Sequence, residues 1–192
     1  IGDVSVMAGV VLLNRSGNTA QHQLFTAAGT KLPIGNYMGI AETDRLGLPN
    51  LQPGTGSFDF LLNANYTLRY NRYGMNVDAS YTFTTANRDA YKYGNRLSTG
   101  LMLFRTFSKG NADIIPQMGA RYEYTLHDYD NYQRRWLNEQ TGGYMAFAAA
   151  GIQAYYKKTG IRLMGNLPIA QQYSKGYVQA KQRLDISVFY LF

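Results

Sequence analysis

Several segments alternate between polar and apolar residues, and charged residues occupy some of their polar positions. These charged residues are Arg69, Asp78, Arg96, Arg121, Glu123, Arg162 and Asp185, and Asn, Ser and Thr lie between them. Fixed charges of both signs on one surface can satisfy one another as ion pairs, or they can line a passage and select solutes by charge. Bases outnumber acids at these positions, because Lys31, Lys181 and Arg183 add to the arginines while only Asp59 adds to the acids. An open passage lined by them is predicted to prefer anions mildly.

Two further stretches resemble chemical motifs. PGTGS (53–57) has the glycines of a phosphate-binding loop, but it lacks the Lys-Ser/Thr pair and a following helix. Its Pro and Gly are more simply explained as a turn into a strand. His127 is followed by Asp128 and Asp130, a set that could activate water or bind a metal weakly, although the polar start of a loop explains it as well. We therefore predict no enzymatic activity, no catalytic residue, no metal site and no cofactor.

The elements that carry these residues are predicted to be strands, because apolar and polar residues alternate along most of the chain. In FDFLLNANYTLRY (58–70), Phe58, Phe60 and Leu62 share one face with the later apolar residues, and the polar residues share the other. The pattern predicts nine strands. They span 3–13, 22–33, 57–71, 74–86, 93–107, 112–127, 142–157, 159–171 and 180–192.

The lengths of the strands and connections indicate the class of sheet. Each predicted strand has at least eleven residues, whereas a tilted membrane-spanning strand needs about 9–11 and an ordinary strand has about 5–6. Short glycine-containing turns at 71–74, 108–111 and 157–160 alternate with longer connections at 34–56, 87–92, 128–141 and 172–179. Outer-membrane barrels have this asymmetry, with the short turns on the periplasmic side. A soluble barrel of lipocalin type is the alternative, with its apolar face inside.

Three observations favour the membrane barrel. The strands are long, charges of both signs share the polar face, and aromatic residues such as Tyr70, Phe83 and Tyr156 gather near the strand ends. We predict one all-β domain over 1–192, a transmembrane antiparallel up-and-down barrel in contact with lipid. Such barrels usually have an even number of strands. Nine strands therefore imply further N-terminal strands outside this sequence. We expect about twelve strands in the complete barrel.

Other composition features are consistent with this class. The chain has no cysteine, its formal charge is +7 without a basic cluster, and it has no apolar run long enough for a membrane helix. Nucleic acid is therefore not an expected partner. Trp136, the only tryptophan, lies beside Arg134 and Arg135 in a long connection. These three residues are candidates for extracellular contact, although Trp136 could instead pack over the barrel mouth.

The C-terminal segment LDISVFYLF (184–192) has apolar residues at every even position, has Asp185 and Ser187 on the other parity, and ends on an aromatic residue. It resembles the C-terminal signal strand that the outer-membrane assembly machinery recognises, with Tyr190 and Phe192 as the signal residues. We expect it to be the closing strand of the barrel, with Asp185 facing the interior.

Several stretches carry a family resemblance. They are GDVSVMAGVVLLN (2–14), GTKLPIGNY (29–37), LQPGTGSFDFLLNANYTLRYNRYGMNVDASYTF (51–83), YKYGNRLS (91–98) and LPIAQQYSKGYVQAKQRLDISVFYLF (167–192). They resemble the Bacteroidetes transporter-like outer-membrane β-barrel proteins, which are similar to porin-like phenol-degradation and fatty-acid channels. The resemblance implies a barrel that passes small solutes, but it gives no specificity. We predict a passive channel in the bacterial outer membrane for small solutes, hydrophobic or anionic. A non-conducting structural or accessory barrel that recruits an envelope partner is the alternative.

Overall fold

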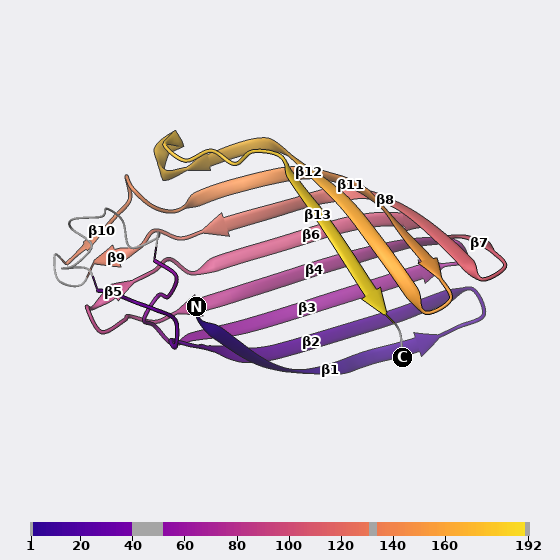
Figure 1. Ribbon diagram of the computed structural model, residues 1–192, viewed down its shortest axis with the longest axis horizontal. Helices are drawn as coiled ribbons and strands as arrows, with labels where there is room; N and C mark the ends of the chain where they lie inside the picture. The colour runs from indigo at the N-terminus through magenta and orange to yellow at the C-terminus, as the bar shows by residue number, and fades with distance from the viewer. Residues whose placement is uncertain (1, 40–51, 131–133, 191–192) are drawn as a thin grey trace.

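A computed structural model describes residues 2–39, 52–130 and 134–190 (Figure 1). Nine long strands make up most of it. They are β1 (Val4–Ser16), β2 (Ala20–Leu32), β3 (Asp59–Tyr70), β4 (Tyr73–Thr84), β6 (Arg96–Arg105), β8 (Ala112–Thr125), β11 (Gly143–Tyr156), β12 (Thr159–Tyr173) and β13 (Arg183–Tyr190). Each pairs antiparallel with the next in the order β1-β2-β3-β4-β6-β8-β11-β12-β13. The prediction of an all-β antiparallel up-and-down sheet is confirmed.

Some predicted boundaries were wrong. The strand expected at 93–107 is split into β6 and a short β7 (Phe107–Lys109). Pairing with β8 is interrupted between Phe104 and Phe107, where Pro116 of β8 has no N–H to donate. The connections expected to be irregular carry three short strands, β5 (Tyr91–Lys92), β9 (Tyr129–Asp130) and β10 (Arg135–Trp136). These pair as a separate sheet in the order β10-β9-β5. Two residues are too few for alternation to reveal a strand.

The two faces of the large sheet differ in polarity. The sheet curls, and β13 passes across in front of the other strands in Figure 1. Polar residues from β3, β4, β8, β11, β12 and β13 line a cavity on the concave side. The apolar parity lies on the convex side, where large side chains are exposed: Phe60 is 56% exposed, Met118 65% and Val188 73%. The polar face is therefore the inner one.

Few apolar side chains lie inside the described part of the protein. The buried ones are Tyr91, Tyr93, Phe147, Ala149 and Met164. A soluble β-sandwich or barrel instead packs its apolar positions inward. Within the described residues, no helix is long and apolar enough to cross a membrane.

The strands β1 and β13 form the two edges of the sheet, and no pairing joins them in the described residues. All thirteen residues of β1 are exposed. The long connections gather at one end of the sheet together with β5, β9 and β10, and the short turns lie at the other end (Figure 1).

Candidate functional site

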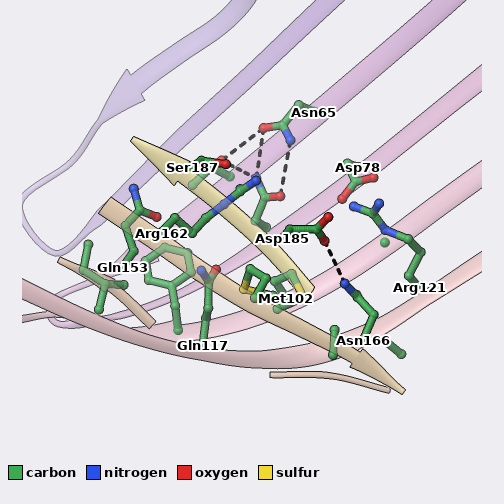
Figure 2. Close-up of a pocket in the computed structure, with 18 of the residues that line it drawn as sticks. Asn65, Asp78, Met102, Gln117, Arg121, Gln153, Arg162, Asn166, Asp185 and Ser187 are labelled. Carbon is green, nitrogen blue, oxygen red and sulfur yellow. Dashed lines mark hydrogen bonds between the residues drawn. The ribbon is translucent and has the colours of Figure 1, made fainter. Parts of the chain in front are cut away.

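The candidate site is a cavity of about 780 Å³ on the concave face, lined by seven strands from β3 to β13 (Figure 2). Five of the charged residues predicted from the sequence line it: Arg69, Asp78, Arg121, Arg162 and Asp185. The other two predicted residues, Arg96 and Glu123, are not part of its lining. Glu123 instead accepts a hydrogen bond from Arg183 Nη1 at 2.9 Å, as an ion pair.

One line of the antiparallel ladder brings three cavity residues together. Asn65 on β3 lies opposite Asp78 on β4, Asp78 lies opposite Gly100 on β6, and Gly100 lies opposite Arg121 on β8. A Cβ atom at Gly100 would approach Asp78 Oδ1 to 2.5 Å. The absence of a side chain at Gly100 thus leaves room for the Asp78 carboxylate, and Figure 2 shows Asp78 and Arg121 pointing toward each other.

A second line of the ladder crosses the whole cavity. It runs through Arg69, Gly74, Phe104, Gln117, Gly151, Met164 and Asp185, one residue from each of the strands β3 to β13 in the large sheet. The guanidinium of Arg69 lies over the Phe104 ring, with 5.8 Å between Cζ and the ring centroid. Because the register places these side chains at one level, the cavity has charged groups on opposite walls.

Amide side chains complete the polar lining. Asn76 Nδ2 donates to Asn65 Oδ1 at 2.9 Å and to Thr67 Oγ1 at 2.8 Å, and Asn166 Nδ2 donates to Asp185 Oδ2 at 2.9 Å. The Asp185 carboxylate is thus bonded by Asn166 of the neighbouring strand, and within the described part of the chain it forms no ion pair with Arg162. Among the described residues, no ion pair joins any of the five charged residues in the cavity. Of the two alternatives for these residues, this arrangement therefore favours charges that act on a solute over charges that only pair with one another.

Several uncharged residues of the cavity were missed from the sequence: Asn65, Asn76, Gln117, Gln153 and Asn166. Four of them occupy the same parity as the charged residues of their strands, so alternation would have placed them on the polar face. Gln153 lies in β11, which has no charged residue to mark that face. Their position within one cavity depends on the register between strands, which alternation within a strand does not define.

A second cavity, of about 340 Å³, lies toward the short turns. Its lining includes Asn18, Asn71, Arg72 and Ser108 from the turn regions. Arg69 lines both cavities. The polar interior therefore extends past Arg69 toward the short-turn end.

At the other end, a group of residues that we call the mouth cluster joins the first strands to the long connection. Lys31 Nζ lies 2.5 Å from Asp59 Oδ2 and 3.4 Å from Asp3 Oδ2. The two acidic side chains are only 5% and 6% exposed, and that of Lys31 is 15% exposed. Thr55 and Ser57 complete the cluster by donating hydrogen bonds to Asp3 and Asp59.

Asp3 holds two parts of the long connection against the start of β1. Its carboxylate accepts the N–H of Gly35 at 3.0 Å and the N–H of Thr55 at 2.9 Å. Burial alone would raise the pKa of Asp3, but the hydrogen bonds from Thr55 and Gly35 and the charge of Lys31 lower it on balance. Asp3 is therefore a charged anchor at neutral pH.

A second structure at this end, which we call the loop cap, consists of β5, β9 and β10 with the flanking residues 86–95 and 126–142. Residues 131–133 of this range lie outside the described residues. At its centre is Asp128, which is 4% exposed. Its carboxylate accepts hydrogen bonds from the Tyr91 hydroxyl at 2.6 Å and from the N–H of Gly94 at 2.7 Å. Burial, followed by the bond to Asp128, raises the pKa of Tyr91 far above its usual value. Tyr91 therefore remains a proton donor at neutral pH.

The possible water-activating or metal-binding set at His127 has a structural role here. Asp128 is committed to Tyr91 and Gly94, and His127 Nδ1 lies within hydrogen-bond distance of the Thr141 carbonyl. Within the described part of the chain, no group of three or more His, Cys, Asp or Glu residues could hold a metal ion.

The remaining predicted contact residues lie at the two ends of the strands. Trp136 is in β10 of the loop cap and packs on Tyr129 with 4.8 Å between ring centroids, yet it is 56% exposed. Arg134 and Arg135 precede it and are also exposed. Tyr190 is the last residue of β13, and Phe192 lies outside the described residues.

The resemblance to porin-like barrels stays an expectation, since no protein family, curated protein or solved structure matches this chain.

Proposed function

We propose that this chain is part of a bacterial outer-membrane β-barrel that acts as a passive channel for small solutes, hydrophobic or anionic. One observation carries the proposal: a curled antiparallel sheet encloses a polar cavity and exposes its apolar side chains on the convex face. An apolar surface of this extent is unfavourable in water, and on a monomeric protein it marks a membrane or protein interface. The hydrocarbon core of a membrane is an environment in which this apolar face is stable.

Closure of the sheet is part of this proposal. In lipid, the unpaired N–H and C=O groups of β1 and β13 would each cost several kcal/mol, so the edges must be paired. Nine consecutive antiparallel strands leave β1 and β13 running in the same direction. Pairing them directly would create a parallel pair, whereas an odd number of additional strands would keep every pair antiparallel. We propose the second solution, in line with about twelve strands.

The polar interior supports a channel in particular. The two cavities share Arg69, so a solute leaving the larger cavity would pass this residue toward the short turns. In outer-membrane barrels this end faces the periplasm. The loop cap would lie on the extracellular side and narrow that entrance. Recognition of Tyr190 and Phe192 by the outer-membrane assembly machinery belongs to the same proposal.

The experiment that tests the channel is conductance in planar lipid bilayers. The purified protein is expected to give ion currents with a mild preference for anions, because three arginines and two aspartates line the larger cavity. Arg162→Glu is expected to change that preference to cations. A unit charge acts with about 1 kcal/mol at 4 Å even in water, which is enough to change a permeability ratio several-fold.

Arg162→Lys is the matched control for this prediction, since it keeps the charge and should keep the anion preference. Absence of any current, including after removal of residues 128–141, would contradict the channel. Stable co-purification with an envelope protein would then support the second candidate, an accessory barrel that recruits a partner. The exposed Trp136 beside Arg134 and Arg135 favours that candidate, because Trp and Arg are common anchors at interfaces.

A further inference from the structure

Gln117 of β8 has an unsatisfied donor in the wall of the larger cavity. Its Nε2 atom is buried and has no hydrogen-bond partner among the described residues. A side-chain amide has two N–H donors, and leaving one buried without an acceptor costs about 1–3 kcal/mol. Gln117 lines the cavity, and rotation of its side-chain amide would turn this buried donor toward an acceptor that enters the cavity.

Two further donor side chains lie on the strands beyond Gln117, and one of them, Gln153, already donates to the Tyr155 hydroxyl. On β11, Gly151 lies opposite Gln117, and Gln153 lies two residues further along on the same face. Gln153 lies opposite Arg162 of β12. The strands β8 and β12 are separated by β11, which is two strand spacings or about 10 Å. The long side chains of Gln117 and Arg162 can span this distance toward one small solute between them. No hydrogen bond or ion pair with another described side chain occupies the Arg162 guanidinium.

We infer that the larger cavity contains a binding site for a small organic anion, whose acceptor oxygens are held by Gln117 Nε2 and the guanidinium of Arg162. This inference rests on the proposed channel and names its class of solute. A carboxylate supplies the acceptors that both groups lack, and an arginine can bind it with two parallel hydrogen bonds. A cavity of about 780 Å³ lies within the range of small-molecule sites, about 300–1,000 Å³.

Other solute classes fit this wall less well. An apolar solute would leave the Gln117 donor unsatisfied and would also remove water from Arg162, at a cost in both cases. A cation would meet the arginines, which outnumber the aspartates in the lining. Asp78 lies on β4, on another part of the wall. Asp185 of β13 lies diagonally beside Arg162, but its carboxylate is already bonded to Asn166. The anion is therefore the ligand that this part of the cavity selects.

Calorimetric titration of the folded protein in detergent tests the site without requiring conduction. Succinate is the probe, and 1,4-diaminobutane is its counterpart of similar length and opposite charge. Succinate should bind and the diamine should not. Gln117→Glu is expected to weaken succinate binding at least about tenfold, because it replaces the donor by a like charge, and 1.4 kcal/mol already corresponds to tenfold. Arg162→Gln should weaken it similarly.

Gln172→Glu is the matched control, since Gln172 is an exposed residue of β12 outside the cavity lining; this variant should bind succinate as the wild type does. Heat-sensitive electrophoretic mobility shows that each variant is folded. Equal succinate affinity in the wild type and both cavity variants would overturn the inference, and so would tighter binding of the diamine. Binding without current would leave the site standing and contradict the channel, whereas current without binding would do the reverse.

Discussion

Replacing Lys31 by methionine is expected to lower the free energy of unfolding by about 3–5 kcal/mol, because removing one partner of a buried ion pair leaves an uncompensated charge. Here two carboxylates would remain, those of Asp3 and Asp59, both almost fully buried. Methionine keeps most of the side-chain volume, so the loss reports the charge. Urea titration in lipid vesicles, followed by the mobility of unheated samples in electrophoresis, measures the change.

Two controls separate this effect from a general one. Lys31→Arg keeps the charge and should lose much less stability. Lys158→Met makes the same change at an exposed turn between β11 and β12 and should have almost no effect. A loss for Lys158→Met as large as that for Lys31→Met would contradict a special role of the mouth cluster.

The same cluster gives stability a defined pH dependence. The pKa of Asp3 is lower in the folded protein than its ordinary value. Its contribution is therefore fully present above the ordinary pKa of a carboxyl and is lost as the pH falls through the lowered folded value. Asp3→Asn should reduce this acid sensitivity, and it should also weaken the contacts with Gly35 and Thr55.

Asp128→Ala is expected to open the loop cap and increase the current through each channel. The substitution leaves the buried Tyr91 hydroxyl and the Gly94 N–H without their acceptor. Hydrogen bonds to a charged group each contribute about 1.5–3 kcal/mol, so the cap loses enough stability to unfold locally while the long strands stay paired. Single-channel recordings measure the increase, and protease cleavage within 126–142 should increase in parallel.

Glu139→Ala is the matched control for the cap. Glu139 is exposed and bonds only to the exposed Lys175, at 2.6 Å, among the described residues. Exposed pairs of this kind contribute little. This variant should therefore keep the wild-type current. If the Asp128→Ala variant is cleaved faster by protease but carries no larger single-channel current, the loop cap does not limit the passage of ions.

The strands were predictable from the sequence because each long strand repeats one rule of alternation with period two. Asp59 to Tyr70 alternates except at Leu61, and β3 spans these residues. The short strands of the loop cap were not predictable, since β5, β9 and β10 owe their pairing to contacts across the chain, such as Tyr91 with Asp128. Local pattern carries no information about such contacts.

The candidate site was predicted in part for a related reason. Alternation placed Arg69, Asp78 and Arg121 on the polar face, and the cavity contains all three. The partner of Asp185 could not be read from alternation, because it depends on the register, which sets Asp185 opposite Met164 with Asn166 able to reach the carboxylate. Gln117 was missed because an unsatisfied donor depends on what surrounds it in three dimensions.

The most direct test of the outward apolar face is a nitroxide scan along β3 in lipid vesicles. The chain has no cysteine, so single cysteines at residues 60 to 67 can each carry a spin label without background. Labels at Phe60, Leu62 and Ala64 should collide mainly with oxygen, which dissolves in lipid. Labels at Asn63 and Asn65 should collide mainly with a water-soluble nickel chelate. The opposite alternation, or a protein that stays in solution without lipid, would contradict a membrane barrel with a polar interior.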